Sequence, residues 1–214
     1  RDVAVTGVQT CALPILDAGA FGFSSGLVYP PSSFSKTGEL IALAKSMAPR
    51  GAHYFTHMRG EAEQLRQSVA EALRIAEEGG VPLQISHLKA SGRDNWPLFD
   101  RALEDIEAAR GRGVDATADI YPYAASSTFM TALLPGWVHD GGAAKLLERI
   151  ADPRIRARIV AEQTTADGRW HTTNGALDFN EVMVATCPNP ADAGLRLDEI
   201  ARKYGKTGPE AMMD

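Results

Sequence analysis

From Leu16 onward, segments with the apolar spacing of a helix alternate with short apolar runs. The clearest helical pattern runs from Glu61 to Glu78, where Leu65, Val69 and Leu73 recur on one face before a Gly-Gly pair. Short apolar runs between such segments are typical of strands. They predict strands at 21–24, 52–56, 82–86, 114–120 and 182–186. Further helices are predicted at 37–47 (with Thr37 as N-cap), 97–110, 152–163, 196–204 and 207–213.

The order of these elements predicts the fold class. Strands that alternate with helices indicate βαβ units and a parallel sheet, hence an α/β fold. After Tyr121 the alternation stops, and loops and short helices are expected instead. A complete (β/α)8 barrel needs eight strands and about 250 residues. A barrel interpretation therefore predicts that this chain supplies only part of one.

Residues 1–15, RDVAVTGVQTCALPI, follow neither periodicity. The string resembles the conceptual translation of a short-read sequencing adapter. We therefore expect residues 1–15 to be a non-native segment that packs poorly and joins no sheet, and residues 16–214 to be the protein proper. The alternative is a native strand and loop.

Composition excludes several classes of protein. Hydrophobic residues make up 44% of the 214 residues and charged residues 23%, as in an ordinary globular protein. With 22 Lys+Arg against 27 Asp+Glu, the net charge is −5, and no basic stripe is present to bind nucleic acid. No apolar run is long enough to span a membrane. The two cysteines, Cys11 and Cys187, cannot form a disulfide framework, which favours a cytoplasmic location.

Two histidines follow predicted strands. His57 and His87 are thirty residues apart, the length of one βαβ unit, so both are expected at the same sheet edge. Imidazole is a good zinc ligand, and two such ligands of one metal would have ring nitrogens roughly 3–7 Å apart. The alternative is a pair of structural histidines at strand ends.

The remaining candidate residues divide into two groups. The segment after the fourth strand offers Tyr121 and a run of hydroxyls that could hold a carboxylate or an oxyanion. His53 is expected roughly 13 Å from His57, at the other end of its strand, and not to be a ligand. His139 and His171 are expected at the surface, and Cys187 as a buried structural thiol.

Four motifs together resemble one enzyme family. GAFGFSSGLVYPP, FTHMRGE, VPLQISHLKASGRDNW and VDATADIYPYAASST are similar to segments of the D-aminoacylases (N-acyl-D-amino-acid deacylases) of the amidohydrolase superfamily. The resemblance implies a partial (β/α)8 TIM-type barrel that binds Zn2+ and releases a D-amino acid and a carboxylate from an N-acyl-D-amino acid. It implies that His57 and His87 are metal ligands. It also implies substrate contacts by Lys89, Tyr121, Ser127 and Tyr29.

The chain also departs from the family pattern. The family's early His-x-His pair, bridging cysteine, general-base aspartate and late arginine are not found between Leu16 and Asp214. We expect them outside these limits, with the general-base aspartate beyond Asp214, so that this chain alone is inactive. The open alternatives are another amidohydrolase, such as a cyclic-amide hydrolase, and a non-catalytic metabolite-binding α/β domain. The expected partner is a small-molecule substrate.

Overall fold

The computed structural model describes residues 13–214, which form two compact units divided between Ser126 and Ser127. Most of the segment 1–15 lies outside the described residues. Of its described part, residues 13–15 begin a short helix and join no sheet, as expected. Leu13, however, packs on the cluster formed by Leu16, Met47 and Ala52, so poor packing is not what this position shows.

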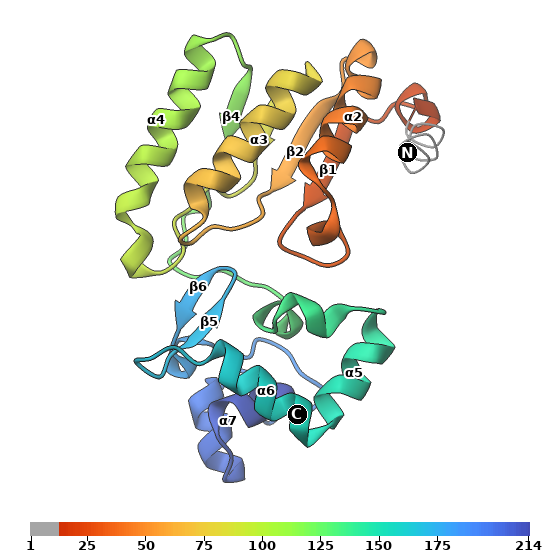
Figure 1. The fold of residues 1–214 in the computed structure, drawn as a ribbon. Helices are drawn as coiled ribbons and strands as arrows, with labels where there is room; N and C mark the ends of the chain where they lie inside the picture. The colour runs from red at the N-terminus through yellow and green to blue at the C-terminus, as the bar shows by residue number, and fades with distance from the viewer. Residues whose placement is uncertain (1–12) are drawn as a thin grey trace. The chain divides into compact units, whose positions relative to one another are not determined.

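The first unit is built on a parallel sheet whose strands follow chain order. Its strands are β1 (Gly22–Gly26), β2 (His53–His57), β3 (Leu83–Ile85) and β4 (Ala116–Ala118). The connecting helices are α2 (Thr37–Met47), α3 (Leu65–Gly79) and α4 (Pro97–Gly111), which pack on one face of the sheet (Figure 1). The predicted α/β fold with consecutive β/α units, the repeat of a TIM-type barrel, is confirmed.

The two faces of this sheet differ in burial. One row across the ladder, Tyr54, Leu83 and Ala116, is at most 2% exposed and faces the helices. The buried stripes of α2, α3 and α4 complete this core. At Gly79 a Cβ atom would lie 2.4 Å from the Ala44 Cβ, so glycine permits the close approach of α3 to α2. The neighbouring row, which contains Phe55, lies on the opposite face, the one that lines the interior of a closed barrel.

The second unit consists of short elements around a core that includes the buried Trp170. An antiparallel pair, β5 (Trp170–Thr172) and β6 (Gly175–Leu177), is its sheet. The helices are α5 (Ala143–Ala151), α6 (Pro153–Gln163), α7 (Leu197–Tyr204) and α8 (Gly208–Met213), with short 3-10 turns at Met130–Leu133, Gly136–His139 and Phe179–Glu181. In residues 13–214 no helix is both long and apolar enough to cross a membrane.

Three sequence predictions need correction. The strand expected at 182–186 is wrong: Met183 forms only an isolated bridge to Arg196, and the hairpin at 170–177 was not predicted. Thr37 is the first residue of α2 and not its cap; its hydroxyl donates to Glu71 instead. The helix expected from Glu61 begins only at Leu65, because residues 58–64 turn across the end of the sheet.

Candidate metal and substrate site

The imidazole rings of His57 and His87 meet at the carboxyl ends of β2 and β3. The Nδ1 of His57 lies 2.8 Å from the Nε2 of His87, and the ring planes are nearly perpendicular. The separation lies just below the lower end of the interval of roughly 3–7 Å expected for two ligands of one metal. The expected convergence of the two rings is therefore present.

Strand alternation alone would not bring these rings together. The ladder pairs Thr56 with Ile85, so the residue beside His57 is Ser86, and His87 belongs by alternation to the opposite face. The chain leaves the regular strand after Ile85, and His87 has a φ of 42°, in the left-handed region that non-glycine residues rarely adopt. This local turn directs the His87 ring toward His57.

Asp119 holds the turn at His87. One oxygen of the Asp119 carboxylate accepts the His87 backbone N–H at 2.7 Å, and the other accepts the Gln84 amide at 2.7 Å. The Asp119 backbone carbonyl accepts the N–H of Leu88 at 2.8 Å. The segment after β4 thus fixes the segment after β3, which compensates for the strained backbone at His87.

Glu61 is the site residue that sequence reasoning missed. Its side chain is 1% exposed, and its Oε1 lies 2.7 Å from Lys89 Nζ, 3.2 Å from His87 Nδ1 and 3.9 Å from His57 Nε2. The sequence pattern predicts Glu61 in the first turn of a helix, where a carboxylate normally faces solvent. Its position four residues after the strand-end His57 was the available signal.

Two further predicted residues lie beside the histidines. The Lys89 ammonium is 5.6 Å from the centre of the Tyr121 ring, and the Tyr121 ring centre is 6.3 Å from that of His87. Tyr29 lies on the other side, with its ring centre 5.0 Å from that of His57. The first unit therefore collects five of the six predicted site residues in one place.

The sixth predicted residue, Ser127, belongs to the second unit, and its role stays a prediction. His53 lies at the opposite end of β2 from His57, as expected, and it is exposed. His171 is exposed, whereas His139 is only half-exposed and lies 3.0 Å from the Thr131 carbonyl. Cys187 is not the buried thiol expected: it is half-exposed, packs at the edge of the second core cluster and donates to the Asn189 carbonyl.

The electrostatics of the cluster favour a neutral His57 ring. Burial lowers the pKa of His57 from 6.5 to about 4, with contributions from His87 and Lys89. A neutral imidazole keeps a lone pair for a metal ion. Burial and the charge of Glu61 raise the pKa of the Tyr121 phenol, which is therefore a hydrogen-bond donor at neutral pH.

The residues present fit a divalent metal ion. Nε2 of His57 is buried and has no hydrogen-bond partner within the described part of the chain. His57, Glu61 and His87 each offer a ligand atom, and these atoms lie within 4.8 Å of one another. Imidazoles are ligands typical of zinc and related metals, and the Glu61 carboxylate adds negative charge beside the two rings.

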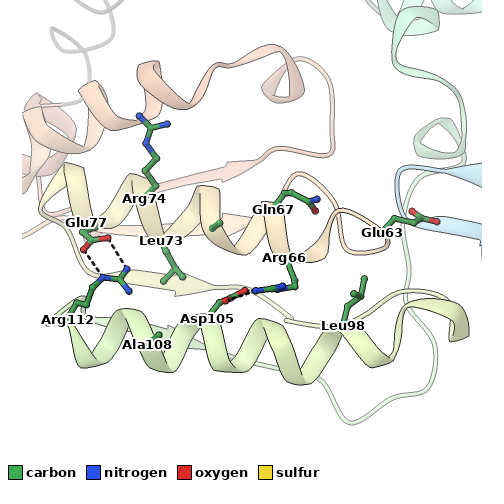
Figure 2. A pocket seen from close by; sticks show the side chains of 11 residues that line it. Glu63, Arg66, Gln67, Leu73, Arg74, Glu77, Leu98, Asp105, Ala108 and Arg112 are labelled. Carbon is green, nitrogen blue, oxygen red and sulfur yellow. Dashed lines mark hydrogen bonds and ion pairs between the residues drawn. The ribbon is translucent and has the colours of Figure 1, made fainter.

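A separate groove lies on the outer helices of the first unit. It encloses about 570 Å³ between α3 and α4, and the ion pairs Arg66–Asp105 and Arg112–Glu77 cross it (Figure 2). None of the predicted site residues lines it. The ion pairs join the two helices, so we interpret the groove as helix packing and not as the site.

Three curated relatives from Alcaligenes xylosoxydans xylosoxydans resemble the chain. N-acyl-D-glutamate deacylase is 40% identical over 115 residues, which is 54% of this chain and 24% of that protein. D-aminoacylase is 36% identical over 129 residues, 60% of this chain and 26% of that protein. N-acyl-D-aspartate deacylase is 37% identical over 116 residues. The matches span about a quarter of each relative's length, and no family model matches the chain.

Solved structures agree with these relatives. N-acyl-D-glutamate deacylase from Bordetella bronchiseptica, in complex with zinc and a phosphonate inhibitor, superposes with a TM-score of 0.73 at 27% identity, over 97% of this chain and 35% of that one. A D-aminoacylase, described as defining a subset of amidohydrolases, has a TM-score of 0.69 at 29% identity with the same coverage. A further D-aminoacylase structure concerns a binuclear metal centre.

The family resemblance and the partial barrel fold are thus confirmed, and a metal cofactor is supported by the metal centres of the neighbours and by the donor set at the strand ends. The sequence identity and the superposition of solved structures both point to the same family. In sequence over about half of its length, and in fold over 97% of it, the chain is similar to the D-aminoacylases (N-acyl-D-amino-acid deacylases).

Proposed function

We propose that this chain contributes to a zinc-dependent hydrolase that cleaves the amide of an N-acyl-D-amino acid into a D-amino acid and a carboxylate. The convergence of His57 and His87 at 2.8 Å, beside Lys89 and Tyr121, is the observation that carries the proposal. The names of the relatives supply the substrate class. The proposal treats residues 16–214 as part of one catalytic barrel in the cytoplasm.

Each side chain has a proposed role. His57 and His87 would hold the metal through their ring nitrogens. A bound zinc ion supplies a water molecule of lowered pKa and polarises a carbonyl oxygen. The Lys89 ammonium attracts the substrate carboxylate, and the Tyr121 phenol donates a hydrogen bond to the same group. Tyr29 and Ser127 are proposed to complete the substrate contacts.

The test is an assay for the free D-amino acid. N-acetyl-D-glutamate and N-acetyl-D-aspartate are incubated with the 214-residue chain and with a version extended to the length of its relatives, and amine release is measured with ninhydrin. We expect release by the extended version, with loss on His87→Ala and on treatment with a strong chelator. Hydrolysis of a cyclic amide in place of these substrates would contradict the proposal. So would hydrolysis that survives His87→Ala and chelation.

A further inference from the structure

Glu61 is a buried carboxylate to which neither the family resemblance nor the proposed function assigns a task. Burial of a charged carboxylate is costly unless opposite charge and hydrogen bonds compensate. At 1% exposure its charge is compensated by one cation in direct contact, the Lys89 ammonium at 2.7 Å. The same contact therefore stabilises the charge of Glu61 and restrains the position of the Lys89 ammonium.

The backbone geometry restrains the pair further. The Glu61 carbonyl accepts the N–H of Ser91 at 2.7 Å, so the segment after β2 is tied to the segment after β3. The Gly60 N–H donates to the buried Ser68 hydroxyl at 3.0 Å, which attaches the same segment to α3. Glu61 thus lies on a fixed stretch of chain and is not free to follow Lys89.

Lys89 itself has three contacts on one side. Its Nζ lies 2.7 Å from Glu61 Oε1, 2.9 Å from His87 Nδ1 and 3.1 Å from the His87 carbonyl. Its side chain keeps 25% of its surface exposed, next to the Tyr121 ring. A long lysine side chain loses much rotational freedom in such an arrangement, and that loss has to be offset by the buried pair.

We propose that Glu61 is a positioning residue: its buried carboxylate holds Lys89, and through it the edge of the His87 ring, in the orientation that faces substrate. The inference rests on the proposed function, because it gives the substrate-binding role to Lys89. It differs from the interpretation of Glu61 as a metal ligand. Oxygen Oε1 already contacts an ammonium, and a divalent cation on the same oxygen would repel that ammonium.

The first experiment measures Lys89 directly and needs no activity. The 214-residue chain is treated with limiting acetic anhydride, and acetylation of each lysine is followed by peptide mass spectrometry. The exposed Lys45 serves as the internal reference. We expect slow labelling of Lys89 in the wild type and an increase of about 10- to 100-fold in Glu61→Gln, the range for loss of a hydrogen bond to a charged group.

Two variants control this measurement. Glu71→Gln removes a half-buried carboxylate that pairs with Arg59, and it should leave the labelling of Lys89 unchanged. Glu61→Asp keeps the charge at a shorter reach, so its labelling rate should lie between those of wild type and Glu61→Gln. If circular dichroism shows that Glu61→Gln does not fold, the acetylation rate of Lys89 in Glu61→Asp tests the proposal in its place.

A second experiment separates positioning from metal ligation. Zn2+ binding and steady-state kinetics are measured for the extended version. We expect Glu61→Gln to raise KM for N-acetyl-D-glutamate, as Lys89→Met does, and to weaken Zn2+ binding less than His87→Ala does. Equal loss of Zn2+ binding in Glu61→Gln and His87→Ala, with unchanged Lys89 labelling, would make Glu61 a ligand and overturn the inference.

The outcomes also distinguish this inference from the proposed function. If no D-amino acid is released while Lys89 is protected in the wild type and not in Glu61→Gln, the proposed substrate fails and the Glu61–Lys89 pairing stands. If hydrolysis occurs but wild-type Lys89 is labelled as fast as Lys45, the positioning role fails and the activity stands.

Discussion

The first unit repeats one strand–helix motif, whereas the second combines short helices with one hairpin. In the first, α3 and α4 each have 15 residues and begin without a side-chain cap, so packing against the sheet stabilises them. In the second, α6 and α8 are shorter and begin with capping side chains, Asp152 and Thr207. At α6 and α8, side-chain caps thus add local hydrogen bonds to the tertiary burial that stabilises helices in both units.

The residues with unusual chemical features are also unequally distributed between the two units. The strained backbone of His87, the buried carboxylate of Glu61 and the shifted pKa of His57 all lie in the first unit. A repeated parallel sheet brings successive strand ends to one edge, which is where such residues can meet. The second unit has histidines, but they do not cluster with other potential ligands among the described residues.

The largest expected effect comes from breaking the two cores one at a time. Trp170→Ala should cost about 3–5 kcal/mol, and Ile85→Ala about 2–5 kcal/mol, because each removes a fully buried side chain. Amide hydrogen exchange should show the loss of protection mainly within the unit that carries the substitution, since the two core clusters are separate. Leu147→Ala, at a position 61% exposed, is the neutral control. Equal loss of protection in both units would show that the cores are coupled.

Acid should destabilise the metal-free first unit selectively. The folded-state pKa of His57 is about 4 and its ordinary value is 6.5, so between these values the unfolded state binds the extra proton. Stability is therefore present above pH 6.5 and is lost as the pH falls toward 4, by about 3 kcal/mol. Urea unfolding at several pH values measures this loss. In His57→Gln the free energy of unfolding should vary less with pH. In His53→Gln, at an exposed position, its pH dependence should be the same as in the wild type.

Metal binding should depend on the first unit alone. His87→Ala should weaken Zn2+ binding by at least about 100-fold, or ~2.7 kcal/mol, since loss of a ligand exceeds the 10- to 100-fold effect of an outer partner. His139→Ala and His171→Ala in the second unit should leave the affinity unchanged. Competition with a chromogenic chelator gives the constants. A large effect of either second-unit variant would place a ligand there.

The smallest expected effect tests the capping difference. Asp152 accepts the N–H of Arg154 at the start of α6, so Asp152→Ala should cost about 1 kcal/mol. Gln64 stands at the same position of α3 without a cap bond, so Gln64→Ala should change the free energy of unfolding by only a few tenths of that. Equilibrium unfolding of both variants compares them. Similar losses would mean that the two kinds of helix start do not differ in stability.

Sequence periodicity located the first unit well and the second less well. The helix bounds 37–47 were predicted as observed, and the first four strands differ from prediction only at their ends. The expected strand at 182–186 failed, because a short apolar run is an ambiguous signal, and here only Val184 is buried while Met183 is 63% exposed. The hairpin at 170–177 has three-residue strands, too short for a period-two pattern to be recognised.

The sequence by itself determined the class of the molecule: strand–helix repeats, histidines at strand ends and motifs that resemble those of one enzyme family. Only the tertiary structure decided that His87 faces His57, because alternation predicts opposite faces and a left-handed turn held by Asp119 reverses it. Only the tertiary structure revealed Glu61 as the centre of the cluster. Periodicity describes regular elements, whereas these residues lie just beyond strand ends, where contacts between distant segments set the backbone direction.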